Sequence, residues 1–435
     1  MKKINLNKGW LIIIILSIIP TALWSFTVRG TAPFGNFSLA TASLGEIFGL
    51  TGMVMFSLNF ILSTRLPFLE YLFNGLNNVY KKHNFLGQCA FIMLLFHPLL
   101  LLPRYAASNK EAAAFLFFSS DSARNFGIFS LALMILLIVL TLYLKPKYNL
   151  WKITHKFFGL ALFLGGLHAF LIPSFVMQNP PLSIYVLGFT VLGLAAFTYR
   201  TLLGWLLIKK YDYSVEKIIK LDDEVVEISL KPLKNKINYQ SGQFIFIAFK
   251  QAGLTSESHP FSISSSPDEE YLKITVKKLG DFTDKLFQVL QTGASAKIEG
   301  PFGIFSYQKS NNHDQIWIAG GIGITPFVGM AKNLLHDAKD YNIYLFYCIK
   351  EEEKAVYADL LKKIEQTISS SLKVILFYSN ENGRISFAKI KNLTDKAFQR
   401  DAFICAPPKM IASLTADFVN NGVNKYQIHS EEFNF

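Results

Sequence analysis

Long apolar runs fill the first half of the chain, and shorter ones separated by polar turns fill the second half. A helix needs about 20 mostly apolar residues to cross a bilayer. We predict six such helices, at residues 9–26, 43–62, 84–102, 126–144, 154–172 and 183–208. The N-terminal sequence MKKINLNK, followed by a run of apolar residues, resembles a signal peptide. Because no clear small-residue cleavage site follows Trp24, we expect an uncleaved first span.

Basic residues are unevenly distributed between the predicted loops. Alternate loops and the flanks of the spans carry Lys2, Lys3, Lys8, Arg65, Lys81, Lys82, Lys145, Lys147, Lys152, Lys209 and Lys210. The other loops carry fewer, chiefly Arg29, Arg104, Lys110 and Arg124. Since cytoplasmic loops hold the excess of Lys and Arg, we expect a multi-pass plasma membrane protein (the inner membrane in a bacterium). Both termini and the second half of the chain would be cytoplasmic.

The second half has two different strand patterns. VVEISL (225–230), FIFIAF (244–249) and LKITVK (272–277) are β-rich and bounded by turn residues, which indicates a small antiparallel barrel. From about Gln315, apolar strands alternate with helix-like stretches, as in a parallel α/β sheet. We therefore predict three domains, at residues 1–210, 211–310 and 311–435.

Composition supports this division. Of the 435 residues, 51% are hydrophobic, 40 are Phe and only 17% are charged, which is more apolar than an ordinary soluble chain. The net charge of +12 sits largely beside the apolar runs, so we expect a lipid bilayer as partner and no nucleic acid. The three cysteines, Cys89, Cys348 and Cys405, form no disulfide framework.

Four of the eight histidines fall in two of the predicted spans. His83 and His97 are fourteen residues apart and His155 and His168 thirteen, which separates each pair by roughly 20 Å along its helix. Both helices run outward, so His83 levels with His155 and His97 with His168. Ionisable residues inside a bilayer are usually functional, and neutral imidazole binds haem iron. We predict two bis-histidine haem b sites. The alternatives are polar residues satisfied by neighbouring helices or, at His83 and His155, anchors at the membrane interface.

One spacing opposes this reading. Fourteen residues return a side chain to within about 40° of the same helix face, whereas thirteen leave it about 140° away. A kink at Gly165-Gly166 would correct the direction of His168. With both axial positions filled, any acceptor would be reduced at the edge of the outer haem. Arg65, Lys81 and Lys82 would meet the inner haem propionates, or serve orientation alone.

Four short motifs follow one another in the predicted barrel. They are YQSGQF (239–244), HPFSIS (259–264), GDFT (280–283) and EGPFG (299–303). Phe261 would pack on an isoalloxazine ring and Ser262 would offer its hydroxyl to a flavin nitrogen. Thr283, with nearby amides, would hold pyrophosphate at a helix N-terminus. Each motif alone is most simply a β-turn, and their order together indicates FAD.

IAGGIGITPF (318–327) follows a buried strand and opens a helix. Glycines at such a junction allow a dinucleotide phosphate to approach the backbone closely. We assign that role to Gly320, Gly321 and Gly323.

With the histidine pairs and the late CAPPKM (405–410), these motifs resemble the NADPH oxidase/ferric reductase transmembrane family, and within it the compact bacterial NADPH oxidases. The resemblance implies six spans and a ferredoxin–NADP reductase-like module, with an antiparallel β-barrel FAD domain and an α/β nucleotide-binding domain. It implies hydride transfer from NADPH (or NADH) to FAD, then single electrons to the inner haem, the outer haem and an external acceptor. The cofactor-binding residues it implies are His259, Pro260, Phe261, Ser262, Ser264, Lys277, Gly280, Phe282, Thr283, Gly320, Gly321, Gly323, Thr325, Pro326, Lys350, Ser379, Arg384 and Phe433. Ser262, Cys405 and Phe433 would be catalytic.

The chain departs from the family pattern at two places. Cys405-Ala406-Pro407 stands where members carry Cys-Gly-Pro, and Lys350 stands where many carry an arginine that reads the 2′-phosphate of NADP. Lysine meets a phosphate as a point charge only, so NADH is an alternative to NADPH. A C-terminal ring would cover the flavin; Phe433 is our choice and Phe435 the alternative.

These features favour an NAD(P)H oxidase that produces superoxide from dioxygen. A ferric or other metal reductase, and an electron-delivery component for a partner protein outside, use the same machinery. A nucleotide-sensing membrane protein without redox activity is a fourth possibility. We expect no obligatory protein partner and, because no calcium-binding loop precedes the first span, no calcium switch.

Overall fold

The computed structural model describes residues 8–105, 108–144, 146–174, 177–337 and 340–432. The chain divides into two compact units, Met1–Ile208 and Lys209–Phe435. The first unit is helical and the second contains both sheets.

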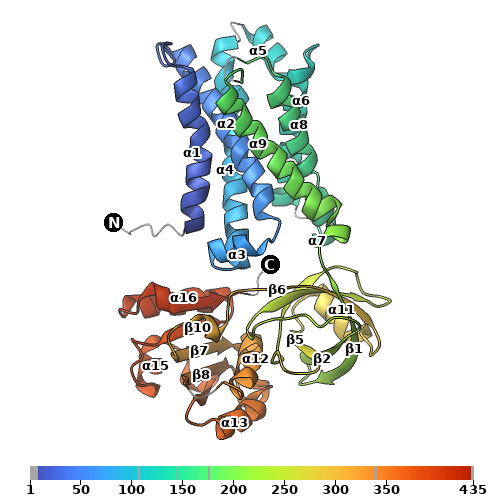
Figure 1. The fold of residues 1–435 in the computed structure, drawn as a ribbon, viewed down its shortest axis with the longest axis vertical. Coiled ribbons are helices and arrows are strands. Elements are labelled where there is room, and N and C mark those ends of the chain that lie inside the picture. Colours follow the sequence, from blue (N-terminus) through green and yellow to red (C-terminus); the bar gives the residue numbers. More distant parts are fainter. Residues whose placement is uncertain (1–7, 106–107, 145, 175–176, 338–339, 433–435) are drawn as a thin grey trace. The chain divides into compact units, whose positions relative to one another are not determined.

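Six helices of the first unit are long and apolar enough to span a membrane (Figure 1). They are α1 (Lys8–Thr27), α2 (Phe37–Leu62), α4 (Leu76–Tyr105), α6 (Ser122–Val139, continued by a π turn at Leu140–Leu144), the pair α7 (Tyr148–His155) and α8 (Phe158–Leu171), and α9 (Pro180–Phe197, continued by a π turn at Thr198–Leu202). Short helices α3 (Pro67–Phe73), α5 (Asn109–Leu116) and α10 (Gly204–Leu207) connect or follow them. The six predicted spans are confirmed.

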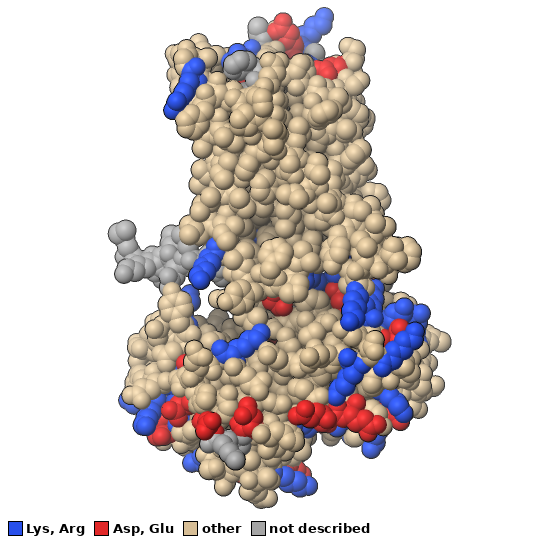
Figure 2. All heavy atoms as spheres, viewed as in Figure 1, with Lys and Arg blue, Asp and Glu red and all other residues tan. Residues whose placement is uncertain are grey.

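Polar caps mark where these helices begin. The side chains of Asn36, Asp121 and Asn179 each accept a hydrogen bond from a backbone N–H in the first turn of α2, α6 and α9, which satisfies donors that the helix cannot. The flank of the helical unit is almost entirely uncharged in the view of Figure 2, as a surface that faces lipid requires. Helix α2 packs on α4, and α6 packs on α8.

The second unit begins with a six-stranded antiparallel sheet in the order β4-β3-β6-β1-β2-β5. Its strands are β1 (Tyr211–Lys220), β2 (Val225–Pro232), β3 (Phe244–Lys250), β4 (His259–Ser262), β5 (Leu272–Lys277) and β6 (Ser295–Phe302). A bridge between Ile263 and Ile274 joins the two edges of the sheet. The predicted barrel is thus present. In the chain, helix α11 (Asp281–Val289) follows β5 and precedes β6.

A five-stranded parallel sheet follows, in the order β11-β10-β7-β8-β9. Its strands are β7 (Asp314–Gly320), β8 (Asn342–Ile349), β9 (Leu372–Tyr378), β10 (Asp401–Cys405) and β11 (Ile428–Glu431), with helices α12 (Thr325–Leu334), α13 (Ala358–Thr367), α14 (Ser379–Asn382), α15 (Phe387–Leu393) and α16 (Pro408–Asn420). The strand order reverses beside β7, between β10 and β8. Ligands of open α/β sheets bind at the carboxyl ends of the strands at such a switch point.

Candidate functional site

The four intramembrane histidines form two facing pairs. His83 of α4 and His155 of α7 have ring centres 6.3 Å apart, and His97 of α4 and His168 of α8 have ring centres 6.5 Å apart. With a metal–nitrogen bond of about 2 Å and roughly 1 Å from nitrogen to ring centre, two imidazoles on opposite sides of one metal ion lie about 6 Å apart. Both pairs therefore fit one axially ligated metal each. We call them the 83/155 pair and the 97/168 pair.

Three of the four imidazoles are oriented by a backbone carbonyl. The Nδ1 atom of His83 lies 3.0 Å from the carbonyl oxygen of Asn59, that of His97 lies 2.7 Å from Gly45, and that of His168 lies 2.8 Å from Ala123. Because a carbonyl only accepts, the proton lies on Nδ1 and leaves the Nε2 lone pair for a metal. This is the usual outer-shell contact of a metal-binding histidine.

His155 lacks this contact. Its buried Nδ1 atom has no hydrogen-bond partner among the residues that the structure describes. Its ring instead packs against Trp151 and Phe158, whose ring centres each lie 5.0 Å from its own. Aromatic packing positions this imidazole, whereas hydrogen bonds position the other three.

Two glycines make room for the 97/168 pair. A Cβ atom at Gly49 would lie 2.6 Å from Nδ1 of His97, and one at Gly127 would lie 2.9 Å from Nδ1 of His168. In each case the glycine is four residues after the residue whose carbonyl accepts the hydrogen bond, Gly45 or Ala123. A helical side chain covers the turn before its own Cα, so glycine at this position uncovers the carbonyl. The sequence reading missed both; the signal was a small residue followed by glycine one turn later.

The bend that aligns His168 lies elsewhere than predicted. Helices α7 and α8 are separated by a turn at Lys156 and Phe157, whose N–H groups donate to Ile153 and Thr154, three residues back. Gly165 and Gly166 lie inside continuous α8, where they allow close packing against Ser130 and Thr190. The turn immediately after His155 therefore changes the direction in which the later His168 side chain points, and this compensates for the thirteen-residue spacing.

Two of the motifs predicted to bind FAD meet in the barrel. The ring of His259 on β4 stacks on Phe282 at the start of α11, with centres 3.7 Å apart and planes 20° apart. Strand β4 pairs with β3, with Phe261 partly exposed and Ser262 buried. Lys277 ends β5 and pairs with Glu224 at 3.4 Å. The HPFSIS and GDFT motifs thus form one continuous region.

The Thr283 hydroxyl forms hydrogen bonds at the start of its own helix, α11. It accepts hydrogen bonds from the N–H groups of Leu279 and Gly280 and donates to the Gly280 carbonyl. It therefore caps α11. A phosphate at this helix end would meet backbone N–H groups first, and the space beside Gly280 is open.

The three predicted phosphate-loop glycines have separate roles. A Cβ atom at Gly323 would lie 2.1 Å from the Cys405 carbonyl oxygen, and one at Gly320 would lie 2.8 Å from Ala406. Both glycines thus permit packing of the loop after β7 against the end of β10. Of the three, Gly321 has a φ of 57° and open space beside it, so its backbone is accessible. Thr325 and Pro326 are buried in the first turn of α12.

The remaining predicted nucleotide residues lie at the carboxyl ends of the parallel strands. Ile349 pairs with Tyr378, so Lys350 and Ser379 emerge side by side, and the Lys350 carbonyl accepts from the Asn380 N–H at 3.2 Å. The exposed Arg384 follows α14. These positions suit a nucleotide that extends from Gly321 across β8 and β9.

The side chain of Cys405 is fully buried at the end of β10. Burial raises the pKa of its thiol well above the usual range, and Glu431 adds to the effect. It is therefore a neutral thiol in the hydrophobic core of the nucleotide-binding part. Ser264 is also fully buried. Phe433 and Phe435 lie outside the described residues.

A buried hydrogen-bond network joins the barrel to the segment before α13. The Tyr357 hydroxyl lies 2.7 Å from Thr275 Oγ1 and donates to Glu227 Oε2 at 2.9 Å. Burial and the Glu227 charge raise the pKa of Tyr357. Nothing in the local sequence pattern pointed to this contact between strands β2 and β5 and the segment before α13.

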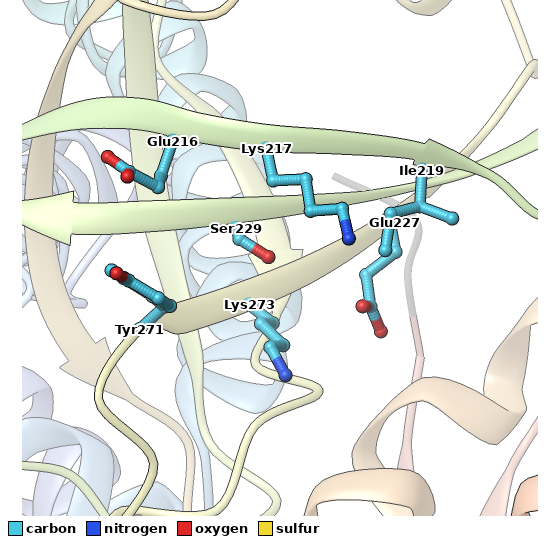
Figure 3. Close-up of a pocket in the computed structure, with 7 residues that line it drawn as sticks. All are labelled: Glu216, Lys217, Ile219, Glu227, Ser229, Tyr271 and Lys273. Atoms are coloured by element: carbon cyan, nitrogen blue, oxygen red, sulfur yellow. The ribbon is translucent and has the colours of Figure 1, made fainter.

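Glu227 also lines a hollow on the face of β1, β2 and β5 that points away from the barrel core (Figure 3). The other lining residues are Glu216, Lys217, Ile219, Ser229, Tyr271 and Lys273. None of the residues predicted to bind FAD or nucleotide is among them. The hollow is thus separate from the predicted cofactor regions.

Three family sequence models match consecutive parts of the chain. A ferric reductase like transmembrane component matches residues 48–166, an FAD-binding domain 210–326 and an oxidoreductase NAD-binding domain 317–415. The chain therefore contains a ferric reductase-like transmembrane domain followed by FAD- and NAD-binding domains. The predicted family resemblance is confirmed. The first match contains His83, His97 and His155, and His168 follows its end.

Curated relatives include NADPH oxidases. Dual oxidase 1 of Caenorhabditis elegans is 27% identical over 292 residues, which is 62% of this chain and 18% of that protein. A superoxide-generating NADPH oxidase heavy chain of Dictyostelium discoideum is 25% identical, over 41% of this chain and 30% of that one. A Candida albicans flavohemoprotein is 26% identical, over 43% and 48%. The chain thus spans less than half the length of each of these relatives.

A solved structure with a similar fold is a flavohemoglobin from Malassezia yamatoensis with bound FAD and heme. It has a TM-score of 0.53 and 16% identity, and the alignment covers 95% of this chain and 99% of that one. At this identity the likeness concerns the fold alone. Six candidate membrane-spanning helices followed by an FAD- and NAD-binding module are shown for this chain.

Proposed function

We propose that this oxidoreductase is a transmembrane NAD(P)H oxidase that takes electrons from NAD(P)H through FAD and two haem b groups to dioxygen, producing superoxide. The observation that carries the proposal is the presence of two facing histidine pairs in the spans, at 6.3 and 6.5 Å. A haem in each pair would supply a one-electron carrier at each of two depths. FAD- and NAD-binding domains on the same chain supply the donor side.

The histidines would bind and orient the haems. Their Nε2 atoms would be the ligands, and the carbonyls of Asn59, Gly45 and Ala123 hold three of the imidazoles in the required tautomer. With two imidazole ligands no open axial position remains for dioxygen. Dioxygen would therefore take its electron beyond the 97/168 pair without binding to iron.

In the second unit, Lys209–Phe435, which we call the reductase unit, the chain would hold the donor and the flavin next to each other. His259, Pro260, Phe261, Ser262, Ser264, Lys277, Gly280, Phe282 and Thr283 would surround FAD, and Gly321, Lys350, Ser379 and Arg384 would bind the nucleotide. The Ser262 hydroxyl would be offered to the flavin ring, and Cys405 would flank the nicotinamide through its backbone, since its thiol is buried. Phe433 would cover the flavin until nicotinamide displaces it.

The direction of transfer follows from the basic loops. Lysines and arginines cluster beside the 83/155 end of the spans, so this end and the reductase unit would be cytoplasmic. The 83/155 pair would receive electrons from FAD, and the 97/168 pair would deliver them on the other side of a plasma membrane.

Ferric or other metal reduction is the second candidate. The match of residues 48–166 to a ferric reductase like component favours it, and the same electron path would serve. The two functions differ only in the acceptor at the 97/168 end.

Purified full-length protein in detergent tests both. A reduced-minus-oxidised spectrum should show bis-histidine haem, and NADPH or NADH should support cytochrome c reduction that superoxide dismutase inhibits. His97→Ala is the matched control, because it should lose superoxide yet retain flavin reduction. Absence of haem would end the proposal altogether. Anaerobic reduction of a ferric chelate without superoxide in air would replace the oxidase by the reductase.

A further inference from the structure

Four exposed lysines lie on one part of the barrel surface, and none of them is in an ion pair among the residues that the structure describes. We call them the basic surface. They are Lys210, just before β1, Lys231 in β2, Lys234, just after β2, and Lys297 in β6. At the other end of β1, in contrast, Lys220 lies 2.8 Å from Asp223. The basic surface thus carries charges that no described carboxylate pairs.

The register of the strands brings these lysines together. Asp212 of β1 is opposite Lys297 of β6. Two residues further along β1, Ser214 is opposite Lys231 of β2. Side chains two residues apart share one face of a strand, and the residue between Asp212 and Ser214 is buried in the barrel core, so this face points outward. Leu233, which is 55% exposed, lies among the lysines, because its N–H group donates to the Asp212 carbonyl at 2.9 Å.

The net charge of the basic surface is positive. The carboxylates on the same face of these strands are Asp212 and Glu299, against four lysines. Nearby Lys236 is occupied elsewhere, because its ammonium group donates to the carbonyl oxygens of Pro267 and Glu269 at 2.7 and 2.5 Å. An exposed leucine among lysines combines an apolar group with positive charge, and this combination binds the boundary of an anionic lipid bilayer.

The covalent chain keeps the basic surface close to the membrane. The sixth candidate span ends at Leu202, and the side chains of α10 that follow Gly204 are exposed and apolar, as at a lipid interface. Strand β1 begins at Tyr211, three residues after Ile208, so its start lies within about 11 Å of the end of the helical unit. This distance is comparable to the range of about 8–10 Å over which charged headgroups act in physiological salt.

Orientation of the spans does not account for the basic surface. Lysines set orientation when they lie within about 15–20 residues of the end of a span. Lys231 and Lys234 lie more than twenty residues after Ile208 along the chain, and Lys297 is much further away. Only folding of the barrel returns these three lysines to the start of β1.

We infer that the basic surface binds the headgroups of anionic phospholipids in the leaflet next to it, with Leu233 inserted among them. The inference depends on the membrane-spanning helices and the barrel alone, so it is independent of the acceptor and of the nucleotide. The barrel is then held at the membrane at two places, by the chain that leaves the sixth span and by the lysines.

Hydrogen–deuterium exchange of the full-length protein in lipid nanodiscs tests this. One set of nanodiscs contains phosphatidylcholine alone, and the other an equal mixture of phosphatidylcholine and phosphatidylglycerol. The amides of residues 231–236 are expected to exchange about tenfold more slowly in the anionic nanodiscs. The difference should vanish in about 1 M salt, where the Debye length falls to about 3 Å. Equal rates in the two nanodiscs at low salt would overturn the inference.

Charge variants show whether the lysines are responsible. Lys231→Gln/Lys234→Gln should exchange equally fast in both nanodiscs. Lys220→Gln/Lys363→Gln is the matched control, because it removes the same charge from two exposed positions, at the far end of β1 and on α13, and should keep the slow exchange. Both variants should unfold thermally at the wild-type midpoint.

Two further results would contradict the lipid assignment. If the control variant lost the slow exchange to the same extent, net charge rather than the basic surface would be responsible. If inorganic phosphate slowed the exchange of residues 231–236 in phosphatidylcholine nanodiscs, the surface would be a site for free anions rather than for lipid headgroups.

Discussion

The helical unit and the reductase unit place their candidate sites in different parts of their structure. In the helical unit four side chains lie in the middle of secondary structure or at its breaks, and neighbouring helices leave space for them at Gly49 and Gly127. In the reductase unit the sites lie where strands end, and backbone atoms of Gly321 and the start of α11 present them. A lipid-exposed bundle must satisfy its backbone within helices, so it has only side chains left for ligands. A sheet edge exposes its backbone and can use it directly.

The largest effect that separates the two units is expected from Gly323→Ala. Its Cβ atom would lie 2.1 Å from the Cys405 carbonyl oxygen, and two backbone segments cannot easily move apart. We expect a loss of about 3 kcal/mol in the stability of the nucleotide-binding part and more than a tenfold loss of flavin reduction by NADPH. Thermal unfolding and stopped-flow flavin absorbance measure these. The haem spectrum of the helical unit should be unchanged; its loss would show that the two units do not respond separately.

Gly127→Ala tests the helical unit in the same manner. The added methyl would lie 2.9 Å from Nδ1 of His168, so the ring must leave its carbonyl partner. We expect the haem content to fall from two per chain to about one, with flavin reduction by NADPH unchanged. Pyridine haemochrome analysis gives the count. Gly188→Ala on α9, where no atom lies within 4 Å of the new methyl, is the control. Equal haem content in the two variants would refute the role of Gly127.

Tyr357→Phe sharpens the comparison within the reductase unit. It removes the hydroxyl that reaches Thr275 and Glu227 and leaves a buried carboxylate with one donor fewer. Such a loss costs about 1–3 kcal/mol. Urea denaturation followed by tryptophan fluorescence should show a lower midpoint, while haem absorbance remains as in the wild type. An unchanged midpoint would mean that water replaces the hydroxyl.

The smallest effect is a pH dependence at the last strand. Burial of Asp401 raises its pKa, but hydrogen bonds from His429, Ser310 and Asn312 outweigh this and hold the pKa below its usual range. A depressed carboxyl pKa contributes stability above the unfolded-state value of about 4, and this contribution is lost as pH falls through the folded-state value. Asp401→Asn should therefore destabilise the reductase unit at neutral pH and converge with the wild type in acid. A difference independent of pH would contradict the linkage.

Much of the architecture could be read from local patterns. Apolar runs of membrane length, the change to β-rich segments and the order of the flavin and nucleotide motifs all depend on neighbours in the chain. They predicted the six spans, the barrel and the parallel sheet, although helices such as α4 (Leu76–Tyr105) extend well past the apolar run of 84–102. The limits differ because capping and polar helix ends carry no apolar signal.

Part of the candidate site in the helical unit could also be predicted from local sequence patterns. Histidines in apolar helices stand out in a sequence because burying them without partners is costly, so their identity and spacing were readable. Their partners were not. The carbonyls of Gly45, Asn59 and Ala123 lie 24 to 52 residues away from the histidines they meet, and such contacts exist only after packing.

Residue types and local spacing therefore specify which elements form and which side chains are available for redox chemistry. The packing of helices and strands specifies how those side chains are held. It decides the turn at Lys156 that aligns His168, and it leaves Nδ1 of His155 without a partner among the described residues. It also decides which of Gly320, Gly321 and Gly323 pack against β10 and which is open. The reason is physical. Helix periodicity and burial costs act between neighbours in the chain, whereas clearance and hydrogen-bond pairing depend on atoms brought together from distant segments.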